Sequence, residues 1–150
     1  MNYKKAFLFL LILVSILTRT DSKSGLFLKY NSTLEKPEAA IIIDIQPLGD
    51  ISEKYTKYVF TELSKIYNHV QIKKPISLTK NAIYPKRNRY RADSLINQLR
   101  QSTANGHVTL GMTAKDISHT KGNIADYGIM GLGYQPGKSC VVSYFRLNKK

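Results

Sequence analysis

The chain of 150 residues contains a single cysteine, no tryptophan and only 10 acidic residues. One cysteine cannot form an intramolecular disulfide, so a folded domain must be stabilised by its apolar core. Cys140 precedes Val141 and Val142, and we expect it to pack as a small hydrophobic side chain rather than to act as a nucleophile. A chain of this length suits one domain.

Motifs that would mark a catalytic centre are also lacking. The three histidines, His69, His107 and His119, include no pair at i and i+4, and His-Glu-x-x-His does not occur. Asp116 and His119 together could supply at most one weak metal contact. Gly-x-Ser-x-Gly and the phosphate-binding loop are absent, and Gly128-x-x-Gly131-x-Gly133 has the wrong spacing for a dinucleotide site. The residues by themselves therefore predict no catalytic residue and no metal site.

Long hydrophobic runs are missing, apart from one near the start. Lys4-Lys5 precede an apolar run over residues 6–14, which is too short to span a bilayer comfortably and fits a secretory signal. Because no Ala-x-Ala site follows, residues 1–22 are predicted to be a signal peptide or an uncleaved signal anchor, and residues 23–38 a linker. We expect export to the periplasm or the exterior, with membrane contact only through this segment. A buried N-terminal helix is the alternative.

Acidic residues are scarcest where basic ones are densest. The formal net charge is +13, and residues 73–91 contain no acid. Such a segment attracts anionic polymers, and tyrosines between the charges could stack on bases. The candidate anion-binding residues are Lys86, Arg87, Arg89 and Arg91. A solvated basic loop is the alternative, since no nucleic-acid-binding fold motif accompanies it.

The pattern of apolar residues predicts alternating strands and helices. Residues 39–45 form a near-continuous apolar run that suits a strand buried on both faces. Asp50 and Glu53 have the spacing of a capping box, which predicts a helix through Tyr67. Residues 68–72 alternate between polar and apolar and predict a second strand.

Further along the chain, Asp93 is available as the cap of a second helix that ends near residue 102. Residues 107–112 predict a strand, and residues 127–133 and 140–147 predict a hairpin around Pro136-Gly137. The expected fold class is α/β (α+β): a mixed, mostly parallel sheet with two helices and an antiparallel edge hairpin.

Several short motifs, taken in order, resemble the archaemetzincins, zinc metallopeptidases of the metzincin clan. The matching motifs are Ile41-x-Ile43 with Pro47-Leu48-Gly49, Tyr84-Pro85-x-Arg87-x-x-Tyr90-x-Ala92, Leu95-Ile96-x-x-Leu99, Leu110-Gly111-x-Thr113-x-x-Asp116-Ile117, residues 128–133, and Val141-Val142-Ser143-x-x-Arg146-Leu147. Arg89 and Ala114 depart from the family pattern, which tends to have Gln and an acid at these places. The resemblance implies that residues 39–150 are the family's N-terminal subdomain, with a metzincin-like fold.

The family's activity is peptide hydrolysis by a bound zinc, and its zinc motif has no counterpart in this sequence. No catalytic residue can therefore be carried over. We expect a truncated metallopeptidase that binds no zinc and is inactive as this chain. The alternative is an exported binding module that uses its basic loop for an anionic partner.

The resemblance also implies a substrate-binding edge. In metzincins an edge strand above the cleft pairs with an extended peptide, and the matching segment here is rich in glycine, which allows another backbone to approach closely. The expected substrate-binding positions are Gly128, Ile129, Met130, Gly131 and Leu132. A loose edge hairpin without a ligand is the alternative.

Overall fold

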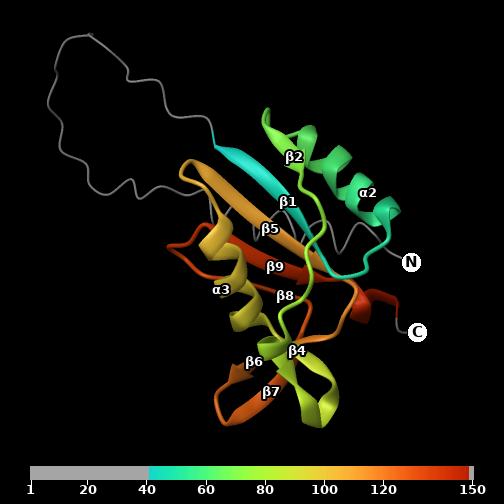
Figure 1. The fold of residues 1–150 in the computed structure, drawn as a ribbon, viewed down its shortest axis with the longest axis vertical. Helices are drawn as coiled ribbons and strands as arrows, with labels where there is room; N and C mark the ends of the chain where they lie inside the picture. The colour runs from blue at the N-terminus through green and yellow to red at the C-terminus, as the bar shows by residue number, and fades with distance from the viewer. Residues whose placement is uncertain (1–40, 149–150) are drawn as a thin grey trace, which may run out of the picture.

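The computed structural model describes residues 41–148, which form two sheets and two α-helices (Figure 1). The expected export signal and linker, residues 1–22 and 23–38, lie outside the described residues. In the described part, no helix combines the length and the apolar character needed to cross a bilayer.

The larger sheet has five strands in the order β2-β1-β5-β9-β8. Its strands are β2 (Val70–Ile72), β1 (Ile42–Leu48), β5 (His107–Thr113), β9 (Ser139–Ser143) and β8 (Gly131–Gly133). Neighbouring strands from β2 to β9 are parallel, and β8 alone is antiparallel to its neighbour. The expected mostly parallel sheet with an antiparallel edge hairpin is confirmed.

The two helices, α2 (Glu53–Ser64) and α3 (Ala92–Ser102), pack against opposite faces of this sheet. On β1, Ile43 and Ile45 belong to the core cluster that contains Leu63 of α2, whereas Leu48 belongs to the cluster of α3. Odd and even positions of a strand point to opposite faces, so the near-continuous apolar run of β1 serves both cores.

Neither helix uses the cap that the sequence predicts. The residue before α2 is Ser52, and it makes no side-chain capping bond, so the predicted box of Asp50 and Glu53 is wrong. Helix α2 ends at Ser64 rather than Tyr67 because the chain turns there toward β2. At α3 the cap position is Arg91, and the Asp93 carboxylate binds residues of other elements instead.

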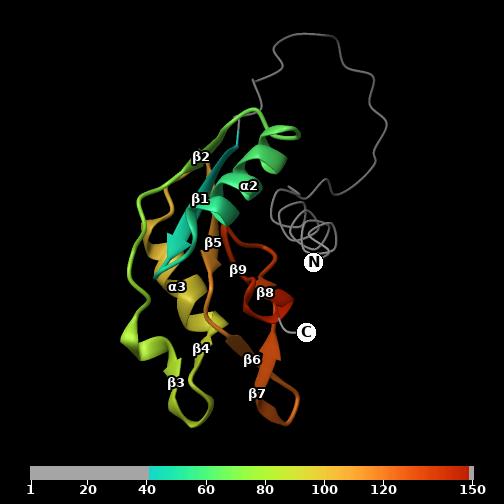
Figure 2. The same cartoon turned by 90° about the vertical axis from the view of Figure 1, so that its right-hand side faces the viewer.

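A second sheet, which the sequence did not predict, lies beside the first. Its order is β3-β4-β6-β7, and its strands are β3 (Ile83–Tyr84), β4 (Arg89–Arg91), β6 (Ile117–Lys121) and β7 (Ile124–Ile129). The predicted basic loop therefore contains two short strands, and the polar segment after β5 contains a third. These strands form the two projections at the lower end of the molecule in Figure 2. They are short and polar, so they lack the apolar periodicity from which strands are recognised.

The predicted strand over residues 127–133 is in fact divided between the two sheets. Ile129 ends β7 opposite Ile117, whereas Gly131 begins β8 opposite Val142. Met130 lies at the crossover. The predicted partner strand ends at Ser143, after which a short 3-10 helix, η3 (Phe145–Asn148), follows.

Candidate functional site: the open edge of β8

Strand β8 is the end strand of the larger sheet, and no described strand pairs with its outer edge. Its side chains are sparse, since Gly131 and Gly133 flank Leu132. Leu132 packs on the α3 core opposite Val141. The outer edge of β8 can therefore be approached closely by another extended backbone.

The hydrogen bonds of β8 show which of its backbone groups face outward. The Ser143 N–H donates to the Met130 carbonyl at 2.8 Å, so the backbone of Met130 faces β9. In an antiparallel pair, residues that face the partner strand alternate with residues that face away. Leu132 opposite Val141 therefore faces β9 as well, and Gly131 and Gly133 present their N–H and C=O groups to the open edge.

The five predicted substrate-binding residues thus fall into different places. Gly131 lies on the open edge, and Met130 and Leu132 are in the same segment with their backbones turned toward β9. Gly128 and Ile129 belong to β7, where they pair with β6. Ile129 packs against the α3 core. Gly133, which sequence reasoning did not include, has the same outward orientation as Gly131.

Gly128 leaves room for a neighbouring side chain of the same protein rather than for a ligand. A Cβ atom built at this position would overlap the guanidinium of Arg146, which lies across the strand. The same guanidinium binds the Asp116 carboxylate through two bonds, Nε to Oδ1 at 2.8 Å and Nη2 to Oδ2 at 3.0 Å. Asp116 is buried, and Arg89 donates a third bond to it at 2.8 Å.

A second cluster lies just beyond the other end of β8. The hydroxyl of Tyr134 donates to the Asp93 carboxylate at the start of α3, and His119 Nδ1 lies 3.0 Å from the same carboxylate. Burial raises the pKa of Tyr134 to about 12, and its bond to Asp93 adds to the effect. Burial opposes ionisation of Asp93, but the bonds from Tyr134 and His119 outweigh it and lower the pKa of this carboxyl.

The four predicted anion-binding residues are not equally free. Arg89 Nη1 lies 3.0 Å from Asp126 in addition to its bond with Asp116, and Arg91 binds Thr120 and lies 3.6 Å from Asp93. The side chain of Arg87 is 64% exposed and lies 3.7 Å from Asp126, and Lys86 is exposed. Three of the four thus lie in ion pairs, but only Arg89 and Arg91 are also shielded from solvent, with side chains 17% and 20% exposed.

Among residues 41–148, no group of three His, Cys, Asp or Glu side chains is placed to hold a metal ion. His107 Nδ1 lies 2.9 Å from the buried Asp44, and His119 is directed at Asp93. The weak metal contact considered for Asp116 and His119 has no geometric basis, because Asp116 is bound by two arginines. The described residues do not fit a zinc ion.

Cys140 is fully buried in the core beneath α2, as expected. Burial raises the pKa of its thiol to about 12, so the thiol stays neutral at physiological pH. A buried neutral thiol is unsuited to act as a nucleophile.

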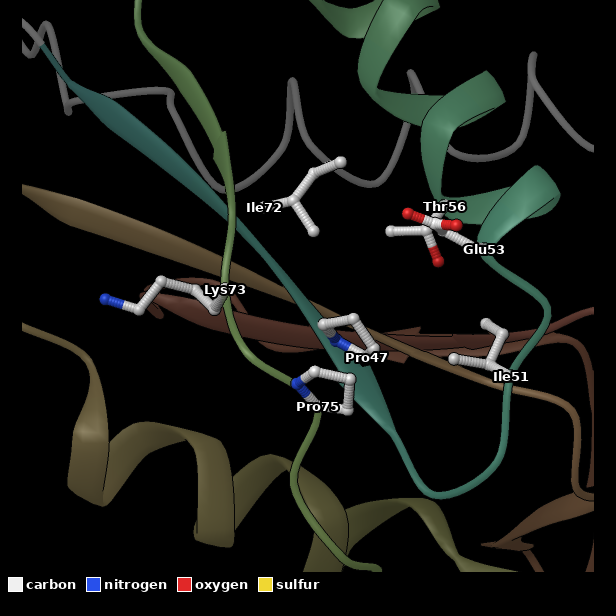
Figure 3. Close-up of a pocket in the computed structure, with 7 residues that line it drawn as sticks. All are labelled: Pro47, Ile51, Glu53, Thr56, Ile72, Lys73 and Pro75. Carbon is white, nitrogen blue, oxygen red and sulfur yellow. The ribbon is translucent and has the colours of Figure 1, made fainter.

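A hollow of about 330 Å³ lies at the opposite edge of the larger sheet (Figure 3). Its walls come from the end of β1, the start of α2 and the end of β2, and include Pro47, Ile51 and Pro75. The buried Thr56 hydroxyl, which has no hydrogen-bond partner, also lines it. Strands β1, β5 and β9 separate β2 from β8, so this hollow is not part of the β8 edge.

Sequence reasoning missed the clusters around Asp116 and Asp93. Asp116 and Arg146 each stand in a motif matched to the archaemetzincins, but nothing in their spacing indicates that they bind each other. Thirty residues separate this pair, and 41 separate Tyr134 from Asp93. Only the fold brings them together.

The architecture described above is an α+β fold whose mixed sheet ends in an antiparallel edge strand. No protein-family model matches the chain. Over 106 residues it is 28% identical to the archaemetzincin of Haloarcula marismortui, and the match covers 70% of this chain and 58% of that protein. The archaemetzincin of Halobacterium salinarum matches with the same identity and coverage.

Solved structures agree with these sequence matches. The archaemetzincin of Archaeoglobus fulgidus, crystallised with malonate, superposes with a TM-score of 0.61 at 27% identity, covering 73% of this chain and 64% of that one. The archaemetzincin of Methanopyrus kandleri has a TM-score of 0.60 at 24% identity, which supports the fold alone. The chain spans less than two thirds of the length of these relatives.

The described part of the chain is therefore archaemetzincin-like in both sequence and fold, which confirms the resemblance carried by its motifs.

Proposed function

We propose that residues 41–148 are the substrate-strand portion of an archaemetzincin-like zinc peptidase, and that an extended peptide binds along the open edge of β8. The observation that carries this proposal is the outward orientation of Gly131 and Gly133 on an edge strand with little side-chain cover. Main-chain hydrogen bonds to such an edge give affinity without strong sequence preference.

We further propose that the 150-residue chain alone does not hydrolyse peptides. Activating water at neutral pH requires a group such as a bound zinc ion. The described side chains supply no ligand set for one, and the printed sequence contains no His-Glu-x-x-His. Here the residues of the chain bind and align a peptide, while zinc would supply the hydrolytic chemistry in the family.

The test uses the purified chain and oxidised insulin B chain, an unstructured peptide, as the probe. Gly131→Pro removes an outward-facing N–H, a change that edge strands tolerate. We expect it to weaken peptide binding by about tenfold, in line with the loss of one or two hydrogen bonds. Circular dichroism checks that the variant is folded. Because the amide of Met130 faces β9, proline at that position would not test the edge.

Unchanged affinity in folded Gly131→Pro protein would contradict the edge-strand proposal. The same preparation is assayed for zinc content and for cleavage of the probe. One tightly bound zinc per chain, together with cleavage that a chelator abolishes, would refute the proposal that this chain alone is inactive.

We retain as a second proposal that the basic segment binds an anionic polymer. Its support is the exposure of Lys86 and Arg87, which leaves two cations near the end of the second sheet available to a partner. The pairing of Arg89 and Arg91 with acids makes the peptide edge the better-supported candidate.

A further inference from the structure

The path of the chain from β7 into β8 decides where the proposed peptide edge lies. The two strands belong to different sheets, and Met130 between them is 42% exposed, so burial of its side chain does little to fix the crossover. Backbone pairing holds Ile129 opposite Ile117 and Gly131 opposite Val142, and side-chain contacts beside Met130 add to this positioning.

Two neighbouring residues, Lys115 and Asp116, anchor this crossover. The Lys115 carbonyl accepts a bond from the Ser143 hydroxyl at 2.6 Å, and the Ser143 N–H in turn holds the Met130 carbonyl. The Asp116 carboxylate binds the guanidinium of Arg146 through two bonds, and that guanidinium lies against Gly128. The chain is thus contacted at the crossover itself, at Met130, and just before it, at Gly128.

The ion pairs around Asp116 extend to the strand that leads into the crossover. Arg89 bridges Asp116 and Asp126, and Asp126 lies in β7, two residues before Gly128. The Asp116 and Asp126 side chains are at most 10% exposed, and bidentate bonds between arginine and carboxylate fix direction as well as distance. A shielded network of this kind resists rearrangement, because removing one member leaves another charge unpaired.

We propose that Arg146 is a positioning residue for the edge strand: held by Asp116, its guanidinium packs on Gly128 and sets where the chain leaves β7 for β8. This inference rests on the proposed function only insofar as β8 binds peptide. Arg146 acts through the strand and touches no ligand.

The test compares Arg146→Lys with Gly128→Ala by amide hydrogen exchange. Lysine keeps the charge but cannot make two directed bonds to the carboxylate. In Gly128→Ala, residue 146 is still arginine, but the new methyl group displaces its guanidinium. We expect each change to accelerate exchange of the Leu132 amide, which faces β9, by about tenfold. Amides of β1 should change by less than about twofold.

The double variant, which carries both Arg146→Lys and Gly128→Ala, tests whether the two changes accelerate Leu132 exchange through the same contact. If both changes act by removing the guanidinium from Gly128, their effects on Leu132 exchange should not add. Arg100→Lys, on an exposed residue of α3, is the matched control and should change neither region. Affinity for oxidised insulin B chain should fall in both single variants and stay unchanged in the control.

Normal Leu132 exchange in folded Arg146→Lys protein would overturn the proposal. So would acceleration spread equally over β1 and β8, since that pattern indicates only general destabilisation. If the wild-type chain binds no peptide, the proposed function fails, and the exchange measurements still decide whether Arg146 positions β8.

Discussion

At the scale of single residues, ionisable side chains hold both ends of the candidate edge. The ion pair of Arg146 and Asp116 lies near the start of β8, and the hydrogen bond between Tyr134 and Asp93 lies near its end. The hydroxyl of Tyr134 donates the hydrogen bond to Asp93, although the residue as a whole is 42% exposed. The Asp93 carboxylate also makes a hydrogen bond with His119, and this bond links β6 to the start of α3.

The link between Tyr134 and Asp93 should depend on pH. The folded-state pKa of Tyr134 is raised to about 12, so its contribution to stability is complete below about pH 10 and is lost as the pH rises toward 12. The lowered pKa of Asp93 makes its contribution present above about pH 4 and lost in stronger acid. We expect Tyr134→Phe to lower the melting temperature near neutral pH but not at about pH 12.

Tyr127→Phe is the control, because Tyr127 is similarly exposed and contacts Lys121 rather than a carboxylate. A phenolate absorbance titration should show that Tyr134→Phe removes a group that ionises late. A stability difference that stays constant across the alkaline range would contradict the assignment.

At the scale of elements, helix α3 packs closely on the middle of β5. Gly111 is in the middle of β5, and a Cβ atom there would lie 2.5 Å from Leu99 Cδ1 and 3.0 Å from Leu48 Cδ1. Leu95, Ile96 and Leu99 of α3 are almost completely buried on this face, and each such side chain contributes about 1.5–3 kcal/mol of transfer free energy. The glycine allows the helix to reach this depth.

Gly111→Ala should therefore lower the free energy of unfolding by about 1–3 kcal/mol through overpacking. Leu99→Val removes one carbon from the side chain that the new methyl group would meet. In that background the cost of Gly111→Ala should be smaller, and denaturant titration of the four proteins measures the difference. An equal cost in both backgrounds would show that contact with Leu99 is not the cause.

At the scale of the whole molecule, the charge of +13 is the most distinctive property. The fold neutralises part of it internally, since Arg89, Arg91 and Arg146 all lie in ion pairs. Overall charge alone produces weak, salt-sensitive retention on an anionic polymer. A specific site requires that particular cations contribute more than others.

If the basic segment binds an anionic partner, replacing Lys86 and Arg87 by Gln should lower the salt concentration that elutes the protein from heparin. Replacing Lys54 and Arg100 by Gln removes the same charge from two other exposed positions and is the control. The first pair should also reduce the salt slope by about two, one for each lost contact. Equal effects of the two pairs would indicate overall charge and no site.

The sequence by itself determined the parts of this protein that depend on local apolar pattern. The buried strand β1, both helices, the hairpin of β8 and β9 and the burial of Cys140 follow from runs and periodicities a few residues long, because such patterns specify which faces must be covered. The matched motifs, taken in order, also identified the archaemetzincin likeness.

Tertiary structure alone decided the second sheet, the division of residues 127–133 between two sheets, and the partners of Asp93 and Asp116. It also decided which backbone groups of β8 face outward, since one residue of register exchanges the inward and outward sets. These features depend on contacts between residues about 30 positions apart, and a short polar strand or a lone arginine carries no signal of its distant partner.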